Sequence, residues 1–284
     1  MKHDTDLIEY PPHERRFRRE SAAWRLPDLE KVPHLQHGIS DRSDGNIALY
    51  RGDQEISLAN RMKFYQANDI DPSRMVKPTI AHGTEVKVIG EDDLGKGALS
   101  SAKDLEIDGL VSFITDTTLS FDTADCQVLM FWDDAARGIG LAHSGWKGTD
   151  GNIAAKMIEE LSQKIPVEEI KVTFGAGICG ECYRFPKEID HPLKQLPNWG
   201  RYRTDYDDGS ASFNINGYLK DQLIEAGVKS ENIDIDTNLC TTHTTTQDSE
   251  ESAFFSHRLA SQKGEEASLA EGRFMTYLSF KPKT

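Results

Sequence analysis

Two apolar runs, each interrupted by a residue type that binds metals, constrain this chain more than any other feature. The first run follows Cys126, and the second closes with His143. The residues between them, 133–137, read Asp-Asp-Ala-Ala-Arg and predict a tight turn, so the two runs are expected to pair as adjacent strands. Pairing would bring Cys126 and His143 close together, and neither residue type is needed to stabilise a strand. We therefore predict that this hairpin forms one wall of the active site.

The rest of the pattern predicts helices and strands in irregular order. A chain of 284 residues can bury a substantial core without disulfides. Helical spacing and capping residues predict three helices, namely 53–67 with Ile56, Ala59, Met62 and Tyr65 as its apolar stripe, one from Thr149 or Asp150 to about 165, and 214–226. Strand-like runs lie at 77–90, where His82-Gly83 interrupts the run, and at 107–114, 170–174, 233–235 and 274–280. This mixture favours an α+β (mixed α/β) fold, a single domain whose mixed β-sheets are flanked by helices.

The first 33 residues differ from the rest of the chain. They hold four prolines and the basic run Arg-Arg-Phe-Arg-Arg at 15–19. We predict that residues 1–33 form an N-terminal arm, either flexible or peripheral, and that 34–284 form the main domain. The basic run is most simply a solvated patch.

Charge and composition exclude several classes of function. The net charge is −14, which argues against non-specific binding to nucleic acid or to an anionic membrane, although a local basic pocket could still bind a small anion. Four cysteines are too few for a disulfide scaffold and indicate a reducing compartment. No apolar run reaches the roughly 18 residues of a membrane span, and the first residues lack the apolar core of a signal peptide. We expect a cytoplasmic protein.

The first candidate metal site is a pair of short motifs, Cys179-Gly-Glu-Cys182 and Cys240-Thr-Thr-His243. Cys-x2-Cys combined with Cys-x2-His fits a structural zinc site of three thiolates and one imidazole. Such sites usually lie in small knuckles of turns, whereas Cys182 is followed by Tyr-Arg-Phe-Pro, which is typical of a strand entry. The sequence therefore favours ordinary loop and core cysteines and leaves the zinc site as an alternative.

The second candidate site is non-local and combines His82, Cys126 and His143. One thiolate and two imidazoles would give a three-ligand zinc site with a fourth position open for water. Each of the three lies at the edge of a strand-like run. Spacing alone does not select them from nine histidines and four cysteines, and a cysteine in a strand is most often core packing.

The third candidate is the loop Ser144-Gly-Trp-Lys-Gly-Thr149, which we predict to connect a strand to a helix. Backbone amides at a helix N-terminus attract anions, and Lys147 would add positive charge. Trp146 could stack on a base. The loop lacks the full Walker spacing, so an ordinary strand-to-helix turn is the alternative.

Three motifs together resemble the YfiH-like family, also called the multicopper polyphenol oxidoreductase or laccase-domain family. They are His82-Gly83, Ala124-Asp-Cys126 and Gly140-Leu-Ala-His-Ser-Gly-Trp-Lys-Gly148. Supporting matches are His37-Gly-Ile-Ser40, Asn60-Arg61, Asp108-Gly-Leu-Val111, Gly175-Ala-Gly-Ile178 with Cys182-Tyr183, Phe254-Phe-Ser-His-Arg258 and Glu271-Gly-Arg273. The resemblance runs from about residue 34 to the end and implies a YfiH-like catalytic domain there. Departures from the family pattern at Arg184 and His257 bear on substrate preference.

The resemblance implies a metalloenzyme that acts on purine nucleosides. The family's metal ligands correspond to His82, Cys126 and His143, with Zn²⁺ expected as the cofactor and copper less expected. The implied activity is that of a purine nucleoside phosphorylase, with deamination of adenosine as a further activity. The implied partners are a small nucleoside and phosphate, and we expect a monomer or homodimer.

Residue roles follow from that implied chemistry. For phosphorolysis, we expect Arg61 and Lys147, with the amides of 145–148, to hold phosphate. For deamination, Asp125 is the candidate acid–base carboxylate, although we favour a role in orienting a ligand histidine. The expected catalytic residues are thus Asp125, Cys126 and Arg61, and the expected substrate-binding residues are Ser40, Asn60, Arg61, Trp146, Lys147 and Gly148.

Three alternatives stay open at this point. Copper-dependent oxidation of phenols is suggested by the family's older name, but a multicopper centre typically needs closely spaced histidine pairs, and this chain has no His-x-His. A hydrolase that edits peptidoglycan precursors, as some relatives are thought to be, is the second. A non-enzymatic, zinc-stabilised binding module is the third.

Overall fold

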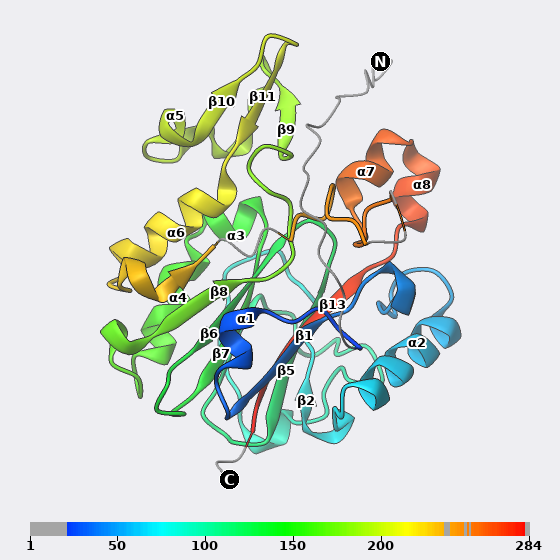
Figure 1. Ribbon diagram of the computed structural model, residues 1–284, viewed down its shortest axis with the longest axis vertical. Helices are drawn as coiled ribbons and strands as arrows, with labels where there is room; N and C mark the ends of the chain where they lie inside the picture. The colour runs from blue at the N-terminus through cyan, green and yellow to red at the C-terminus, as the bar shows by residue number, and fades with distance from the viewer. Residues whose placement is uncertain (1–21, 236–238, 247–248, 250, 282–284) are drawn as a thin grey trace.

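Three β-sheets and the helices around them organise the part of the chain that this computed structural model describes, residues 22–235, 239–246, 249 and 251–281 (Figure 1). The four-stranded sheet has the order β1 (Leu35–Ile39), β13 (Phe274–Phe280), β5 (Thr117–Thr123) and β2 (Met75–Val76). The six-stranded sheet has the order β12 (Ile233–Asp234), β8 (Lys171–Phe174), β6 (Gln127–Trp132), β7 (Ile139–Ser144), β4 (Gly109–Ser112) and β3 (Val86–Val88). The small third sheet has the order β10 (Arg203–Asp205), β11 (Ser210–Phe213) and β9 (Arg184–Pro186).

The helices lie outside these sheets. They are α1 (Pro27–Glu30), α2 (Gln54–Ala67), α3 (Trp146–Asp150), α4 (Ile153–Leu161), α5 (Trp199–Tyr202), α6 (Ile215–Glu225), α7 (His257–Gln262) and α8 (Glu265–Ala270) within the described ranges. In Figure 1, α4 and α6 lie beside β8 at one side of the molecule, and α2 lies at the opposite side. Both large sheets contain parallel and antiparallel pairs, such as β3 with β4 and β6 with β7. The predicted mixed α/β fold is therefore confirmed.

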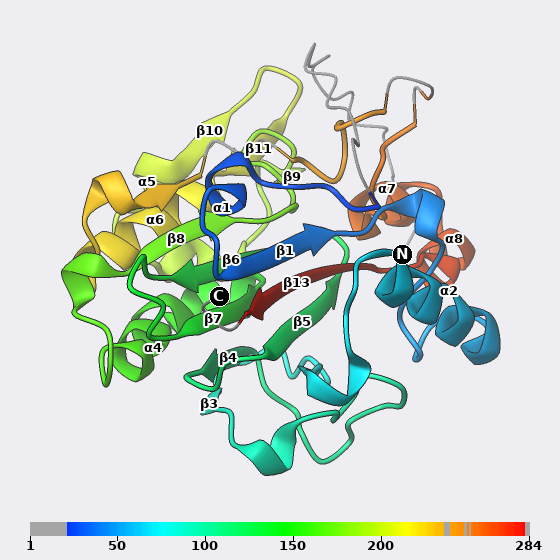
Figure 2. The same ribbon diagram turned by 60° about the horizontal axis from the view of Figure 1, so that its bottom comes forward.

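The two large sheets pack face to face, and β6 shows how the sequence achieves this. Val128 and Met130 belong to the core shared with Leu119 and Phe121 of β5, on the four-stranded sheet. Leu129 and Phe131 point the other way, because successive side chains of a strand alternate between its faces. They pack under α4 and α6, which explains why this strand is apolar at nearly every position. Figure 2 shows β1, β13 and β5 side by side in the four-stranded sheet.

The predicted hairpin around residues 133–137 is confirmed. β6 and β7 are antiparallel, with Val128 opposite His143 and Gln127 opposite Ser144. Asp133 closes the turn, since its carboxylate accepts hydrogen bonds from the backbone N–H groups of Ala135 (3.0 Å) and Arg137 (2.9 Å). Cys126 and His143 therefore lie at the same end of the hairpin.

The helix predicted with Thr149 or Asp150 as its N-cap is confirmed as α4, but it begins at Ile153 with Asn152 as its N-cap, and the short helix α3 precedes it. The chain turns directly from β7 into α3 with Gly145 as the N-cap residue, and α3 ends at Asp150. Asn152 then adopts a left-handed conformation (φ 55°), and its side chain accepts a hydrogen bond from the N–H of Ala155 at the start of α4. The two helices are separate because the Gly151-Asn152 break redirects the chain.

The helix α2 is confirmed with Asp53 as its N-cap, but the predicted apolar stripe is right only at Tyr65 and wrong at Ile56, Ala59 and Met62, which are exposed. Ile56 and Met62 are exposed, at 61% and 42%. The buried side carries Ser57, Arg61, Phe64 and Tyr65 instead. Phe64 packs edge-on against Tyr277 of β13, so α2 covers the outer face of the four-stranded sheet with a partly polar surface.

The interruption predicted at His82-Gly83 within 77–90 is confirmed, and it is where the chain crosses between the two large sheets. β2 pairs with β5 in the four-stranded sheet, whereas β3 pairs with β4 in the six-stranded sheet. The chain between them carries His82, whose φ of 57° is in the left-handed region.

Among the described residues, no helix has both the length and the apolar character that a membrane span needs.

The described part of the predicted N-terminal arm packs on the main domain. Trp24 is buried, forms a bridge with Ile39 of β1, and donates a hydrogen bond from Nε1 to Asp41 Oδ2 (2.8 Å). Leu26 and Leu29 are buried as well. Residues 22–33 therefore belong to the packed body, and the prediction of an arm concerns residues 1–21, which lie outside the described residues.

A buried histidine ties this segment to β1 and gives a pH-dependent stability. The N–H of Leu26 donates to His37 Nε2 (2.7 Å), and burial together with the charge of Arg25 lowers the pKa of His37 from 6.5 to about 3. The unfolded chain binds the proton below pH 6.5 while the folded chain does not, so stability falls as the pH drops from 6.5 toward 3. In His37→Gln, thermal unfolding temperatures should run parallel to those of the wild type above pH 6.5 and fall less steeply below it. Equal slopes in the acid range would contradict this assignment.

Candidate metal centre

The predicted metal ligands lie on or beside two chain crossings between the two large sheets. The crossing from β2 to β3 carries His82, and the crossing from β5 to β6 carries Asp125 and Cys126. Asp125 has φ 86°, so both crossings hold a non-glycine residue in the left-handed region. The rings of His82 and His143 lie 5.3 Å apart at 86°, and Cys126 is close enough to His143 to raise its pKa. The structure thus places two of the three predicted ligands edge to face, with the third packed against Gly145; that the three bind one metal ion stays a prediction.

Two glycines let the loop after β7 reach this cluster. A Cβ atom at position 145 would lie 2.9 Å from Cys126 Sγ, so only glycine leaves room for the sulfur. A Cβ atom at position 148 would lie 3.1 Å from Ser144 Oγ and 3.5 Å from the carbonyl of Gly83. The Ser-Gly-Trp-Lys-Gly motif is therefore explained by close packing against the residues that carry the donors.

Asp108 holds the ring of His143 and the backbone of His82, and no pattern in the sequence predicted this role. Its Oδ1 lies 2.8 Å from Nδ1 of His143, and the same carboxylate accepts hydrogen bonds from the backbone N–H groups of His82 (3.0 Å) and Gly83 (2.6 Å). Engagement of Nδ1 leaves Nε2 of His143 as the atom available to a metal. The signal that could have found Asp108 is its position directly before β4, the neighbour of β7.

The charges at this centre suit a cation. Burial lowers the pKa of His143, but Cys126 and Asp108 outweigh it and raise the value to about 9. Burial raises the pKa of Asp108, yet hydrogen bonds from His143 and Gly83 hold it below its usual value. Burial and His143 lower the pKa of His82. Two imidazoles and one thiolate are a donor set that zinc accepts, and the exposure of His82 leaves one side open to a fourth ligand.

Asp108→Asn should weaken this centre without unfolding the protein. The amide cannot accept hydrogen bonds from His143 and from both backbone N–H groups in the same way, so the histidines lose their fixed orientation. We expect metal affinity or turnover to fall about 10–100-fold. Zinc titration and steady-state kinetics measure this, with Asp104→Asn, an exposed carboxylate, as the matched control. Unchanged affinity and turnover would show that Asp108 does not position the donors.

Asp125 supports the chain beside Cys126 rather than orienting a histidine. Its carboxylate accepts hydrogen bonds from Thr241 Oγ1 (2.5 Å), Ser256 Oγ (2.7 Å) and the N–H of Arg258 (2.6 Å). Burial raises its pKa, and these three donors lower it only in part. We predicted that Asp125 orients a ligand histidine. In this structure, Asp108 contacts the ring of His143 instead.

Two of the predicted substrate-binding residues, Trp146 and Lys147, are exposed beside the candidate metal centre. Trp146 is 38% exposed, and Lys147 Nζ lies 5.6 Å from the centre of its ring. Besides burial and His143, the charges of Lys147 and Arg273 lower the pKa of His82, so both cations are within electrostatic reach of it. Arg273 is a second residue whose role the sequence did not predict, although it lies in the Glu271-Gly-Arg273 motif.

Ser40, Asn60 and Gly148 are engaged in packing. Ser40 is fully buried, and its Oγ accepts a hydrogen bond from the N–H of Met275 (2.8 Å). Asn60 donates to the carbonyl of Asn46 (3.0 Å). Gly148 is buried in α3. As substrate contacts, these three residues remain predictions.

Arg61 is saturated by the protein itself. Its five N–H donors reach the carbonyls of Ile47, Gly97 and Ala98 and the carboxylate of Asp122, and its side chain is only 2% exposed. In this structure the guanidinium has no donor left for phosphate. The contacts of Arg61 therefore favour a structural role over the predicted roles in catalysis and phosphate binding.

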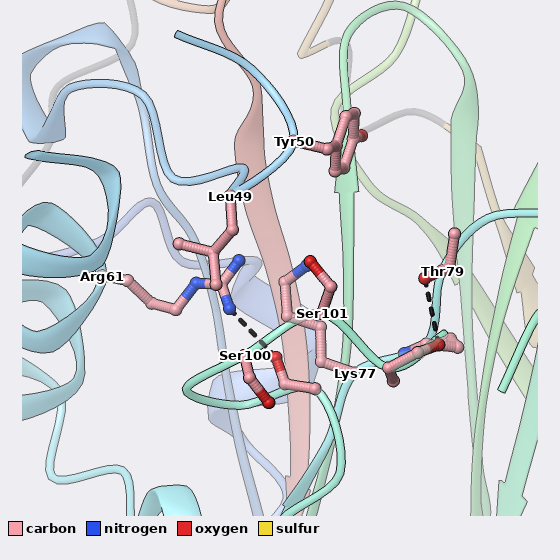
Figure 3. Close-up of a pocket in the computed structure, with 10 residues that line it drawn as sticks. Leu49, Tyr50, Arg61, Lys77, Thr79, Ser100 and Ser101 are labelled. Carbon is pink, nitrogen blue, oxygen red and sulfur yellow. Dashed lines mark hydrogen bonds between the residues drawn. The ribbon is translucent and has the colours of Figure 1, made fainter. Parts of the chain in front are cut away.

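A small pocket opens next to this buried arginine (Figure 3). Figure 3 shows Arg61 pointing from α2 toward the chain that carries Ser100 and Ser101. Lys77 forms a buried ion pair with Asp122. Burial lowers the pKa of Lys77 to about 8 although Asp122 raises it. The pocket therefore presents the hydroxyl groups of Ser100 and Ser101 above the buried Lys77–Asp122 ion pair. This ion pair holds the chain at the end of β2, ahead of His82.

The chain resembles named enzymes and a solved structure. It is 27% identical over 242 residues, 83% of this chain and 82% of the relative, to purine nucleoside phosphorylase YlmD of Bacillus subtilis (strain 168). It is 28% identical over 161 residues, 56% of this chain and 62% of the relative, to adenosine deaminase RL5 of an unknown prokaryotic organism. Its fold matches the crystal structure of the hypothetical protein YfiH of Bacillus licheniformis with a TM-score of 0.74 at 22% identity, covering 93% of this chain and 99% of that one.

These likenesses agree with the resemblance found in the sequence. The family model described as multi-copper polyphenol oxidoreductase laccase matches residues 35–280, which include all the donors of the candidate centre. This chain therefore belongs to the laccase-like, YfiH-type family.

Proposed function

We propose that the protein is a zinc-dependent purine nucleoside phosphorylase. The observation that carries this proposal is the pair of rings of His82 and His143, 5.3 Å apart beside Cys126, with Asp108 holding the ring of His143 and the backbone of His82. The named phosphorylase among the relatives, which aligns over most of both chains, supports the choice of substrate class. A zinc ion held by these three donors supplies a Lewis acid for a phosphate or water oxygen.

The remaining roles belong to side chains around the centre. Lys147 and Arg273 are the cations within electrostatic reach of His82, and they replace Arg61 in our assignment of the phosphate-binding residues. Trp146 offers an exposed ring on which a purine base can stack. Asp108 and Asp125 position the donors and do not contact substrate.

The experiment is direct incubation of purified, zinc-loaded protein with adenosine, inosine and methylthioadenosine, with and without phosphate. Release of free base together with a sugar 1-phosphate, dependent on phosphate, is the expected result by product chromatography. Absence of base release from a protein that holds zinc at Cys126 would sink the phosphorylase proposal. Turnover of muropeptides under the same conditions would instead support a hydrolase of peptidoglycan precursors.

Lys147→Ala should weaken phosphate binding while leaving the metal in place. Removing one charged hydrogen-bond partner costs about 1.5–3 kcal/mol, so we expect the KM for phosphate to rise roughly 10–100-fold. Lys229→Ala removes an exposed lysine on the far segment after α6 and is the matched control. An unchanged phosphate KM in Lys147→Ala, with inosine saturating, would exclude this lysine as a phosphate ligand.

Deamination of adenosine is the second candidate. The likeness to adenosine deaminase RL5 favours it, and so does the raised pKa of Asp125 beside Cys126. The same incubation distinguishes the reactions, because deamination produces inosine from adenosine without phosphate. If inosine forms, Asp125→Asn separates an acid–base role from a supporting role by its effect on the pH profile of turnover.

A further inference from the structure

A second group of potential metal ligands lies at the loop after β8. Cys179 and Cys182 follow that strand, and Cys240 and His243 come from the segment 239–246. The sequence favoured ordinary core cysteines here, but the structure brings one ligand atom of each residue within 4.8 Å of every other. All three cysteines are free thiols rather than disulfides. This Cys3His cluster shares no residue with the His82, Cys126 and His143 centre.

The spacing within the Cys3His cluster matches a tetrahedral site. With Zn–S bonds of about 2.3 Å and a Zn–N bond of about 2.0 Å, the sulfurs lie about 3.8 Å apart and the nitrogen about 3.5 Å from each sulfur. Cys182 Sγ lies 3.3 Å from Nδ1 of His243, which is close to that edge length. Three thiolates held this close repel one another, and a divalent cation removes that repulsion.

The backbone is already shaped around the sulfurs. The N–H groups of Cys182 and Tyr183 both donate to the carbonyl of Cys179 (3.1 and 3.0 Å), a turn that directs both cysteines of the first motif to one point. The N–H of Cys179 donates to Cys240 Sγ (3.3 Å), and Thr242 Oγ1 lies 3.1 Å from the same sulfur. Such contacts orient and stabilise thiolate ligands.

Four protein ligands and deep burial indicate a structural rather than a catalytic site. Cys182 and Cys240 are buried, with relative exposures of 0% and 2%. Structural zinc sites are closed by four protein ligands, whereas catalytic ones keep a position open. The Cys3His cluster offers no such vacancy.

The cluster joins two segments that support the candidate active centre. Gly177 and Cys240 form a parallel bridge, and Thr241 N–H donates to the carbonyl of Gly177 (3.1 Å). The hydroxyl of Thr241 donates to Asp125 Oδ1 (2.5 Å), and the N–H of Ile178 donates to the carbonyl of Asp125 (2.7 Å). Both segments therefore hold the residue that precedes Cys126.

We infer that Cys179, Cys182, Cys240 and His243 bind a structural Zn²⁺ that clamps the loop after β8 to the segment 239–246 and thereby positions Asp125 beside Cys126. The metal binding is independent of the proposed function, and only the effect on turnover rests on it.

The test is metal analysis of the full chain purified with zinc. We expect two zinc ions per wild-type chain and one in each of two serine variants, Cys240→Ser and Cys126→Ser. The two variants are matched controls, because the same substitution removes a different site in each. Retention of two zinc ions in Cys240→Ser, or copper in place of zinc at this cluster, would overturn the assignment. A Cys179–Cys182 disulfide detected by thiol counting and mass spectrometry in non-reduced protein would do the same.

A spectroscopic measurement keeps the inference testable if Cys240→Ser does not fold. Cys126→Ser loaded with Co²⁺ retains only the Cys3His cluster, and its thiolate-to-cobalt absorption should have the intensity of three Co–S bonds. The absence of that absorption would overturn the inference without any change in the cluster.

The effect on catalysis is distinguishable from failure of the proposed function. His243→Asn should lower kcat about 10–100-fold while zinc stays at Cys126, as expected when a supporting group is lost. An unchanged kcat with one zinc lost would remove the positioning role but leave the metal site. If no variant or wild type turns over nucleosides, the metal counts and the cobalt spectrum still decide the inference.

Discussion

Cys126→Ser should abolish turnover while the protein stays folded. A serine hydroxyl stays protonated at neutral pH and is a much poorer zinc ligand than a thiolate. Loss of a Lewis acid costs several kcal/mol of transition-state stabilisation, and each 1.36 kcal/mol is tenfold in rate, so kcat/KM should fall on the order of 10³-fold or more. The Cys126 sulfur lies at the edge of the packed core, in the space that Gly145 leaves free. The thermal unfolding temperature should therefore change little.

Cys179→Ser is the matched comparison, because it changes the same atom in the other cluster. It should lose one zinc ion but keep metal at Cys126, with a smaller loss of turnover. Zinc content and kcat/KM measured on both variants separate the two centres. A Cys126→Ser protein that turns nucleosides over at the wild-type rate would exclude the whole centre from catalysis.

Arg61→Ala should be the most destabilising change on the surface-facing helix α2. It removes five hydrogen bonds and leaves Asp122 with Lys77 as its only remaining cation in the described contacts. Because Lys77 still compensates Asp122, the loss comes from the buried carbonyls of Ile47 and Gly97, which lose the donors that Arg61 supplies at about 1–3 kcal/mol each, so we expect a total of about 2–5 kcal/mol. Denaturant unfolding should show a loss of this size.

Arg201→Ala is the control for Arg61→Ala. Arg201 also pairs with an aspartate, Asp221 at 3.2 Å, but its side chain is 71% exposed, so stability should change by less than about 1 kcal/mol. The same variants decide the role that the sequence predicted for Arg61. A stable Arg61→Ala protein with a raised phosphate KM would return Arg61 to the phosphate site, whereas a destabilised protein with an unchanged phosphate KM would establish it as structural.

Local signals in the sequence located much of the fold. The apolar runs on either side of 133–137 predicted the hairpin of β6 and β7, because a continuous apolar run is typical of a strand covered on both faces. Asp53 and Asn214 located the starts of α2 and α6, since an N-cap acts on residues two or three positions away. The motifs at His82, Cys126 and His143 named the donors only because they resembled a family. Spacing could not choose them.

Tertiary contacts decided what those local signals could not. The sequence by itself determined the hairpin, the capped helices, the mixed α/β class and the family. The face of α2 that is buried, the link from Asp108 to both histidines, and the saturation of Arg61 depend on atoms brought from distant segments, so no local pattern encodes them. The Cys3His cluster shows the same limit, because Cys182 and His243 meet only when the loop after β8 folds onto the segment 239–246. Side-chain chemistry is local, but which groups meet is set by packing of the whole chain.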